Sequence, residues 1–293
     1  VGGIVGVGGM NLNIAGCTNY ANVSGSSERV GGICGQHYGD LSECANYGDV
    51  RATNGNVGGI AGYMRRGAKT PISYCRNEGK VSAASDKYVG GIIGQAATHE
   101  FEADHLCNLG EVRCDGNPSE IETIGTIVGG CSENGTLALS DSYNAVRLFD
   151  DFETTRTGAT TESDVYSLSL DGDEDDNAQT LTIPAMREMA DDLDMPISEE
   201  TKITIIRNMV INSNGDTYTL APLVGTEEED MAAAFILAVY DGDGNLVGVS
   251  MDEKSTGLKT QYDCSVNAPD GASAKAMMWY SSNGMKPYKN CVK

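Results

Sequence analysis

A short glycine-rich block recurs along the first half of the chain, and this repeat limits the fold more than any other feature. The hexapeptide VGGIVG at residues 1–6 returns as VGGICG at 30–35, VGGIAG at 57–62 and VGGIIG at 89–94, and more weakly as IGTIVG at 124–129. Successive copies start 29, 27, 32 and 35 residues apart. Periods of about 20 to 50 residues are typical of solenoids, in which each repeat buries its apolar face against its neighbours.

A second block follows each of the first four copies and places an asparagine four residues before a valine. These pairs are Asn19 and Val23, Asn46 and Val50, Asn77 and Val81, and Asn108 and Val112. Alternate residues of an extended chain share one face, so the asparagine and valine positions are expected to point inward. A stack of identical amides, or an Asn-x-Gly turn, would satisfy the buried asparagines. The Gly-Gly pair of the first block predicts a bulge or a close backbone contact between coils.

We therefore predict an all-β chain with an N-terminal β-solenoid and a C-terminal immunoglobulin-like β-sandwich. Residues 1–147 form the solenoid of about five repeats, and the acid-rich residues 148–200 form a connecting segment with one short helix that has Pro184 near its start. Residues 201–293 form the sandwich, because short alternating strands are separated there by Gly, Asn and Asp turns. The strands are expected at 202–210, 217–223, 233–240, 245–250, 258–266 and 274–280. A flat array of hairpins is the alternative to the solenoid, but it would bury little apolar surface.

Nine cysteines are present, and three of them occupy the same slot of the second block. These are Cys17, Cys44 and Cys75, and the fourth copy has Leu106 in that slot. A slot that accepts leucine favours free, buried thiols over a metal site, and the cysteines lack zinc-ligand spacing. Cys264 and Cys291 are the pair expected to form a disulfide, if any pair does.

The charge excludes some classes of partner. Forty-two acidic residues against 20 basic ones give a net charge of -22, which would repel a phosphate backbone, so no nucleic-acid partner is expected. No apolar run reaches the roughly 18 residues that a membrane span needs, so no membrane insertion is expected in this segment. Because the chain starts at Val1 within a repeat, we expect it to be part of a longer protein.

The sequence predicts no catalytic residue, no metal and no cofactor. His99 and His105 are six residues apart, which does not match the HExxH zinc motif, and we expect an insertion loop there. The acidic segments 170–177 and 241–245 lack the glycine and glutamate positions of an EF-hand loop, and are expected to be a solvated loop and a hairpin turn. The alternative is a polysaccharide-degrading β-helix, whose carboxylate pair could not be recognised among so many acids.

The VGGIxG block followed by Asn-x-Gly-x-Val resembles the GLUG repeat of bacterial surface proteins, with isoleucine in place of the leucine of the family's Gly-Leu-x-Gly core. This resemblance covers residues 1–147. The segment FILAVYDGDGNLVGVS from residue 235 is similar to β-sandwich modules of secreted proteins from anaerobic Firmicutes. Together they imply an extracellular, adhesin-like protein without catalytic activity that binds glycans or host surface proteins. Tyr20 and Tyr47, in an outward-facing repeat slot, are the candidate ligand contacts.

Overall fold

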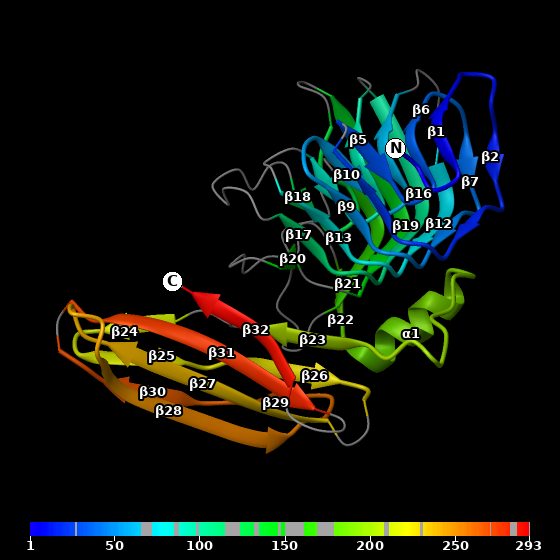
Figure 1. Cartoon of the computed structure of the whole chain (residues 1–293). Helices are drawn as coiled ribbons and strands as arrows, with labels where there is room; N and C mark the ends of the chain where they lie inside the picture. Colours follow the sequence, from blue (N-terminus) through cyan, green and yellow to red (C-terminus); the bar gives the residue numbers. More distant parts are fainter. Residues whose placement is uncertain are drawn as a thin grey trace. The chain divides into compact units, whose positions relative to one another are not determined.

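The computed structural model describes residues 1–26, 28–65, 72–84, 88–97, 100–114, 124–131, 135–145, 148–149, 161–168, 179–207, 211–228, 231–269, 271–281 and 286–292. These residues form two compact units, Val1–Ser198 and Glu199–Lys293. The first unit is a parallel β-solenoid with one helix, and the second consists of antiparallel sheets (Figure 1). The predicted all-β fold class is therefore confirmed.

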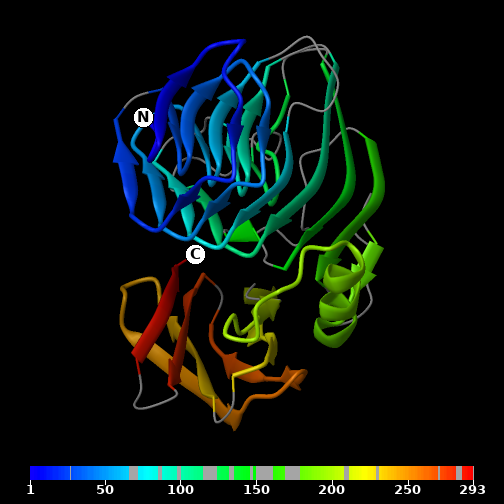
Figure 2. The same cartoon turned by 90° about the vertical axis from the view of Figure 1, so that its right-hand side faces the viewer.

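In the described part of the solenoid, four parallel sheets are formed, and their strands stack from coil to coil (Figure 2). The β6 sheet contains β1 (Val5–Gly8), β6 (Cys34–His37), β11 (Ala61–Met64) and β15 (Ile93–Ala96). The β5 sheet contains β5 (Arg29–Gly31), β10 (Asn56–Gly58), β14 (Val89–Gly90) and β18 (Ile124–Gly125). The VGGIxG blocks at 30–35, 57–62 and 89–94 thus each supply one strand end to the β5 sheet and, after the Gly-Gly pair, the start of a strand in the β6 sheet.

The second block supplies the other two sheets. The β9 sheet contains β4 (Val23–Gly25), β9 (Val50–Ala52), β13 (Val81–Ala83), β17 (Val112–Cys114) and β20 (Leu148–Phe149). The β12 sheet begins with β2 (Ile14–Ala15), β3 (Thr18–Asn19), β7 (Leu41–Ser42), β8 (Ala45–Asn46), β12 (Ile72–Asn77), β16 (Glu100–Asn108) and β19 (Thr136–Asn144). Equivalent repeat positions are paired, since Val81 lies between Val50 and Val112. The register that the repeats predict is therefore confirmed.

Among the described residues of the coils, the buried apolar side chains form two separate cores. One contains the valines of the β9 and β5 sheets, among them Val30, Val50 and Val81, which are fully buried. The other lies between the β6 and β12 sheets and contains Ile33, Ile60 and their equivalents together with Cys44 and Cys75. Valine and isoleucine of one VGGIxG block, such as Val30 and Ile33, therefore enter different cores.

The Gly-Gly pair is required because the backbone passes too close to its neighbours for a side chain. A Cβ on Gly58 would lie 2.2 Å from the carbonyl oxygen of Ala61. A Cβ on Gly59 would lie 2.2 Å from the carbonyl oxygen of Gly91 in the next coil and 2.3 Å from Cγ of Asn77. Real Cβ atoms do not approach this closely, so the predicted close backbone contact between coils is confirmed.

The buried asparagines form a hydrogen-bonded ladder along the solenoid. Nδ2 of Asn19, Asn46 and Asn77 donates to Oδ1 of the asparagine in the next coil, at 2.7, 2.8 and 2.9 Å respectively. Each of these Nδ2 atoms also donates to the carbonyl two residues later, for example Asn77 to Gly79 at 2.7 Å. Both predicted solutions, a stack of amides and a local Asn-x-Gly contact, are thus present together.

The parallel structure continues beyond residue 147. Strands β21 (Thr161–Leu168) and β22 (Gln179–Leu181) extend the β12 sheet, and helix α1 (Ile183–Asp192) follows them with Pro184 in its first turn. The predicted short helix is confirmed. The residues after the helix are held by Tyr143, whose hydroxyl donates to the Met195 carbonyl at 2.6 Å. The segment expected as a connection therefore contributes strands and packing to the first unit.

Two further expectations from the sequence concern the stretch after His99 and the acidic segment 170–177. The stretch after His99 was expected to be an insertion loop, but Glu100–Asn108 is strand β16, which pairs with β12 and β19. The loop prediction is wrong because Phe101, Ala103 and Leu106 are buried in the core, while Glu100 and Glu102 are exposed. His99 itself lies outside the described residues. The acidic segment 170–177 also lies outside them.

The cysteines of the repeat slot are free thiols, as predicted. Cys44 and Cys75 are buried in the core, and their Sγ atoms donate to the carbonyl oxygens of Ser42 and Ser73 at 3.1 and 3.2 Å. Burial raises the pKa of two other free thiols, Cys34 and Cys107, to about 12. The folded chain therefore holds these thiols in their neutral form at pH values where an unfolded chain would ionise them.

These raised pKa values predict alkaline destabilisation of the solenoid. The unfolded thiols titrate near 9.0, so Cys34 and Cys107 stabilise the fold fully below pH 9.0. As the pH rises from 9.0 towards about 12, the contribution of each thiol to the free energy of unfolding decreases by roughly 1.4 kcal/mol per pH unit. The reason is that only the unfolded chain releases these protons in that range. Urea unfolding at several pH values checks this. A variant with both cysteines replaced by alanine should show a shallower alkaline decrease, and an equal slope in both proteins would contradict the prediction.

The described residues of the second unit form three antiparallel sheets. The first sheet contains β23 (Thr204–Arg207), β26 (Leu223–Thr226) and β29 (Thr260–Gln261). The second contains β24 (Ile211–Asn214), β25 (Thr217–Leu220) and β30 (Cys264–Asn267). The third contains β28 (Leu246–Ser255), β27 (Ala232–Tyr240), β31 (Ser273–Ser281) and β32 (Lys286–Val292). Side chains from several of these sheets share one core, which includes Leu220, Val224 and Phe235. Strands β24 and β32 lie outside the expected strands, and β26 overlaps an expected strand only at Leu223.

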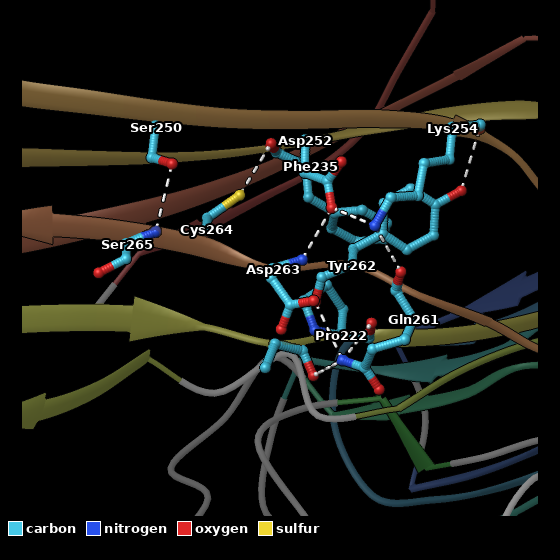
Figure 3. A network of polar contacts seen from close by, with 11 residues as sticks. Pro222, Phe235, Ser250, Asp252, Lys254, Gln261, Tyr262, Asp263, Cys264 and Ser265 are labelled. Atoms are coloured by element: carbon cyan, nitrogen blue, oxygen red, sulfur yellow. Dashed lines mark hydrogen bonds and ion pairs between the residues drawn. The ribbon is translucent and has the colours of Figure 1, made fainter.

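Side chains link β28 to the segment that contains β29 and β30 (Figure 3). The Asp252 carboxylate accepts the backbone N–H of Asp263 at 2.9 Å and lies 2.6 Å from Lys254 Nζ. Lys254 Nζ in turn donates to the Gln261 carbonyl at 2.8 Å and lies over the Tyr262 ring. These bonds join β28 to the end of β29 and to the residues between β29 and β30.

Two sequence expectations in the second unit have opposite outcomes. The turn at 241–245 is the predicted hairpin turn between β27 and β28, and the Asp241 carboxylate accepts the backbone N–H groups of Asp243 and Asn245. The expected bridge between Cys264 and Cys291 is not formed, because Cys264 is a free cysteine whose Sγ donates to the Phe235 carbonyl at 3.2 Å.

Candidate functional site

Tyr20 and Tyr47 lie on the outer face of the β12 sheet. Each follows a ladder asparagine, and because alternate residues of a strand point to opposite faces, the inward asparagine turns the next residue outward. The two rings are stacked, with centroids 5.0 Å apart and planes 7° from parallel. Tyr20 is 77% exposed and Tyr47 is 40% exposed. The predicted outward slot is thus confirmed, and one face of the Tyr20 ring is left uncovered by the stack.

Polar side chains continue this column on the third coil. Glu78 occupies the slot after Asn77, and its carboxylate lies 3.5 Å from the guanidinium of Arg76. Partial burial raises the pKa of Tyr47, and the Glu78 carboxylate adds to this effect. Arg76 also donates to the Met195 carbonyl at 3.0 Å, which fixes its side chain. The column therefore offers two phenol rings next to an anchored ion pair.

A second aromatic stack lies on the neighbouring strands. The rings of Tyr74 in β12 and His105 in β16 are 4.2 Å apart and 17° from parallel, and Tyr74 is 43% exposed. His105 Nδ1 is 2.9 Å from Asp104 Oδ1. Both residues have a positive φ, 50° and 48°, as do their repeat equivalents Gly16, Glu43 and Asp141. This left-handed corner directs the side chain outward immediately before the cysteine slot.

Small residues lie beside the first stack. Thr18 and Ala45 are paired in β3 and β8, two residues before Tyr20 and Tyr47, so they share the outer face with them. A flat area of small side chains bordered by tyrosines is suited to a ligand that combines apolar faces with hydroxyl groups, since tyrosine offers both a ring and a hydrogen-bonding group. We call Thr18, Tyr20, Ala45 and Tyr47 the tyrosine platform.

Sequence reasoning identified one of the two aromatic stacks described on this face. Tyr20 and Tyr47 were found because they are identical residues in one repeat slot. Tyr74 and His105 were missed because their slot contains different residue types in each coil, namely Gly16, Glu43, Tyr74 and His105. The signal that could have identified them is their constant position directly before the cysteine slot.

A second polar row lies where the β5 and β6 sheets meet, but its members satisfy one another. The guanidinium of Arg29 lies 4.0 Å from the centre of the Tyr63 ring and donates to Gln36. Asn56 Nδ2 donates to Gln95 Oε1 at 2.7 Å. Because these groups are paired and Gln36 and Asn56 are 9% exposed, the row offers less to a ligand than the tyrosine platform does.

No protein-family model, no curated protein and no solved structure matches the chain. The resemblance to the GLUG repeat therefore stays a prediction. In the described part of the chain, no group of three or more His, Cys, Asp or Glu residues is placed to hold a metal ion. No helix among the described residues is long and apolar enough to cross a membrane.

Proposed function

We propose that this chain is a non-catalytic binding scaffold of a bacterial cell-surface or secreted protein, and that the tyrosine platform contacts its ligand. Glycans are the ligand class that we favour over host surface proteins. The observation that carries the proposal is the stacked, exposed pair of Tyr20 and Tyr47 on a rigid parallel sheet. Tyrosine is enriched at binding surfaces because its ring is apolar and its hydroxyl is polar, and stacking holds these two rings in one orientation.

The rest of the solenoid supports a scaffold role. The amide ladder and the in-register coils fix the backbone beneath the tyrosines, so little conformational entropy would be lost when a ligand binds. A net charge of -22 favours neutral or cationic partners over polyanions. Neutral glycans, whose sugar rings have apolar faces and hydroxyl edges, fit both the charge and the tyrosines.

Replacing Tyr20 and Tyr47 together by alanine is expected to weaken glycan binding by at least roughly tenfold. Each substitution removes one contact between a tyrosine ring and the glycan, which is worth about 1 kcal/mol or more. Binding is measured on a glycan array that includes mucin and plant polysaccharide fragments, and then by titration calorimetry with the best ligand. The fold should be retained, because the Tyr20 ring is 77% exposed.

A matched control replaces Tyr240, a partly exposed tyrosine of the second unit, by alanine. This variant should bind the glycan as the wild type does. Unchanged binding by the double variant would contradict the role of the platform. Wild-type protein that binds no arrayed glycan but captures a host surface protein would favour that partner class, and turnover of a polysaccharide would contradict the non-catalytic assignment.

A further inference from the structure

We propose that Cys44 and Cys75 form a redox site, at which a hydroperoxide oxidises the two thiols to a disulfide that links the second and third coils. Both residues are free cysteines, and both lie in the core between the β6 and β12 sheets. The coils that carry them are flanked on each side by another coil, since β8 pairs with β3 and β12 pairs with β16. Their side chains are buried on the inner face of the sheet, whereas the tyrosine platform lies on its outer face, so the redox site is separate from the proposed ligand contacts.

Equivalent positions in the repeat place the two cysteines next to each other. The residues before and after them are paired in register. The Cys44 carbonyl accepts the backbone N–H of Arg76 at 2.9 Å, as expected for neighbouring parallel strands. Such strands stand about 4.8 Å apart, and the Cα atoms of a disulfide are separated by about 4.4 to 6.8 Å. The spacing of the coils therefore suits a bond between the two sulfur atoms.

The two thiols also have the same orientation. Each Sγ atom donates to the carbonyl oxygen two residues earlier, at 3.1 Å for Cys44 and 3.2 Å for Cys75. The preceding residues, Glu43 and Tyr74, share a left-handed backbone conformation, with φ of 52° and 50°. The thiols are hydrogen-bonded to each other as well. The two sulfur atoms are therefore neighbours before any reaction occurs.

Hydrogen bonding between the thiols favours the reactive form of Cys44. Bonds from the Cys75 and Cys17 thiols lower the pKa of Cys44 to about 7, although burial acts in the opposite direction. Burial raises the pKa of Cys75 well above its usual value. The thiolate is the nucleophile in thiol oxidation. Cys44 is therefore the residue that attacks the oxidant, and Cys75 is the residue that attacks the oxidised sulfur.

The reaction has two balanced steps. The Cys44 thiolate attacks one oxygen of hydrogen peroxide, so that an S–O bond forms, the O–O bond breaks, and hydroxide leaves and takes up the proton that Cys44 released. Cys44 is thereby oxidised to a sulfenic acid, and the peroxide is reduced. The Cys75 sulfur then attacks the Cys44 sulfur, an S–S bond forms, and the hydroxyl group leaves with the Cys75 proton as water. Two thiols and one peroxide thus give one disulfide and two waters.

Two other buried cysteines are internal controls for this chemistry. Cys34 and Cys107 are 0% exposed and Cys44 is 1% exposed, so the three differ little in burial. The residues paired with Cys34 and Cys107 in the neighbouring coils are not cysteines. Burial raises the pKa of both thiols to about 12. A difference in oxidation rate therefore reports the neighbouring thiol and not access to solvent.

The test treats the reduced full chain, freed of reductant, with hydrogen peroxide at neutral pH without denaturant. Samples are alkylated in denaturant, digested and mapped by mass spectrometry, with fragmentation that separates Cys34 from Cys44. The variant Cys75→Ala removes the second thiol of the proposed bond. Cys34→Ala is the matched control, because it removes an equally buried thiol from the same core. A parallel set of reactions contains a cyclic diketone that traps sulfenic acids.

We expect Cys44 of the wild type to be oxidised at least roughly tenfold faster than Cys34 and Cys107, with a disulfide to Cys75 as the product. Cys34→Ala should form the same disulfide at the same rate, whereas Cys75→Ala should leave Cys44 as a sulfenic acid that the diketone traps. Equal rates for the three wild-type cysteines would overturn the proposal. A wild-type bond from Cys44 to Cys17, or oxidation that begins only in urea that unfolds the solenoid, would also overturn it. The wild-type comparison decides the outcome without the variants, should Cys75→Ala fail to fold.

Discussion

Replacement of Asn77 by alanine is expected to lower the free energy of unfolding of the solenoid by about 3 to 5 kcal/mol. Asn77 lies in the middle of the ladder and is fully buried. Its side chain accepts from Asn46 Nδ2 and donates to Asn108 Oδ1 and to the Gly79 carbonyl. Alanine would leave a buried donor on Asn46 without its acceptor and remove a donor from Asn108, and each loss costs about 1 to 3 kcal/mol.

The effect can be measured separately in the two units of the chain. Urea-dependent labelling of the buried thiols Cys75 and Cys107 reports the opening of the solenoid. The fluorescence of Trp279, the single tryptophan, reports the second unit and should not change. Asn19→Ala is the matched control, because Asn19 makes a ladder bond on one side only. A loss in Asn77→Ala no larger than that in Asn19→Ala would show that the ladder contributes little to stability.

The substitution Gly59→Ala is expected to destabilise the solenoid by about 3 kcal/mol or more, or to prevent its folding. The added methyl group would lie 2.2 Å from the Gly91 carbonyl oxygen and 2.3 Å from Asn77 Cγ. Neither neighbour can withdraw, because the carbonyl belongs to the next coil's backbone and the amide belongs to the ladder. One methyl group therefore disturbs both the coil spacing and the ladder.

Gly9→Ala is the control for this experiment, because no atom lies within 4 Å of its added Cβ. It should unfold within about 0.5 kcal/mol of the wild type. Thermal unfolding followed by circular dichroism, together with the yield of soluble protein, distinguishes the two variants. If Gly59→Ala were as stable as Gly9→Ala, the Gly-Gly pair would not be explained by close packing.

The repeat made the solenoid predictable, but it did not reveal its cross-section. Val50 and Val81 could be assigned to one column because they recur at a fixed distance from a buried asparagine. The repeat could not show that Val30 and Ile33 enter separate cores, since this depends on the path of the chain through the Gly-Gly turn. Strands β21 and β22 were not predicted, because they carry neither of the two repeat blocks. They join the β12 sheet through backbone pairing.

The candidate site was predictable to a similar extent. Identical residues in one slot identified Tyr20 and Tyr47, and strand alternation gave their direction. Stacking of Tyr74 on His105 depends on a left-handed backbone corner that accepts different residue types in each coil, so residue identity carried no signal. The surroundings of the Cys264 thiol could not be predicted either, because they depend on which distant strands pair in the folded chain.

The two-core cross-section has an evolutionary consequence. Each interior coil offers the next coil the same valine, isoleucine and asparagine surfaces that it receives from the previous one. Duplication or deletion of one whole coil would therefore change the length of the molecule by about 4.8 Å without redesign of either core. Solenoid length can thus vary between descendants in fixed increments.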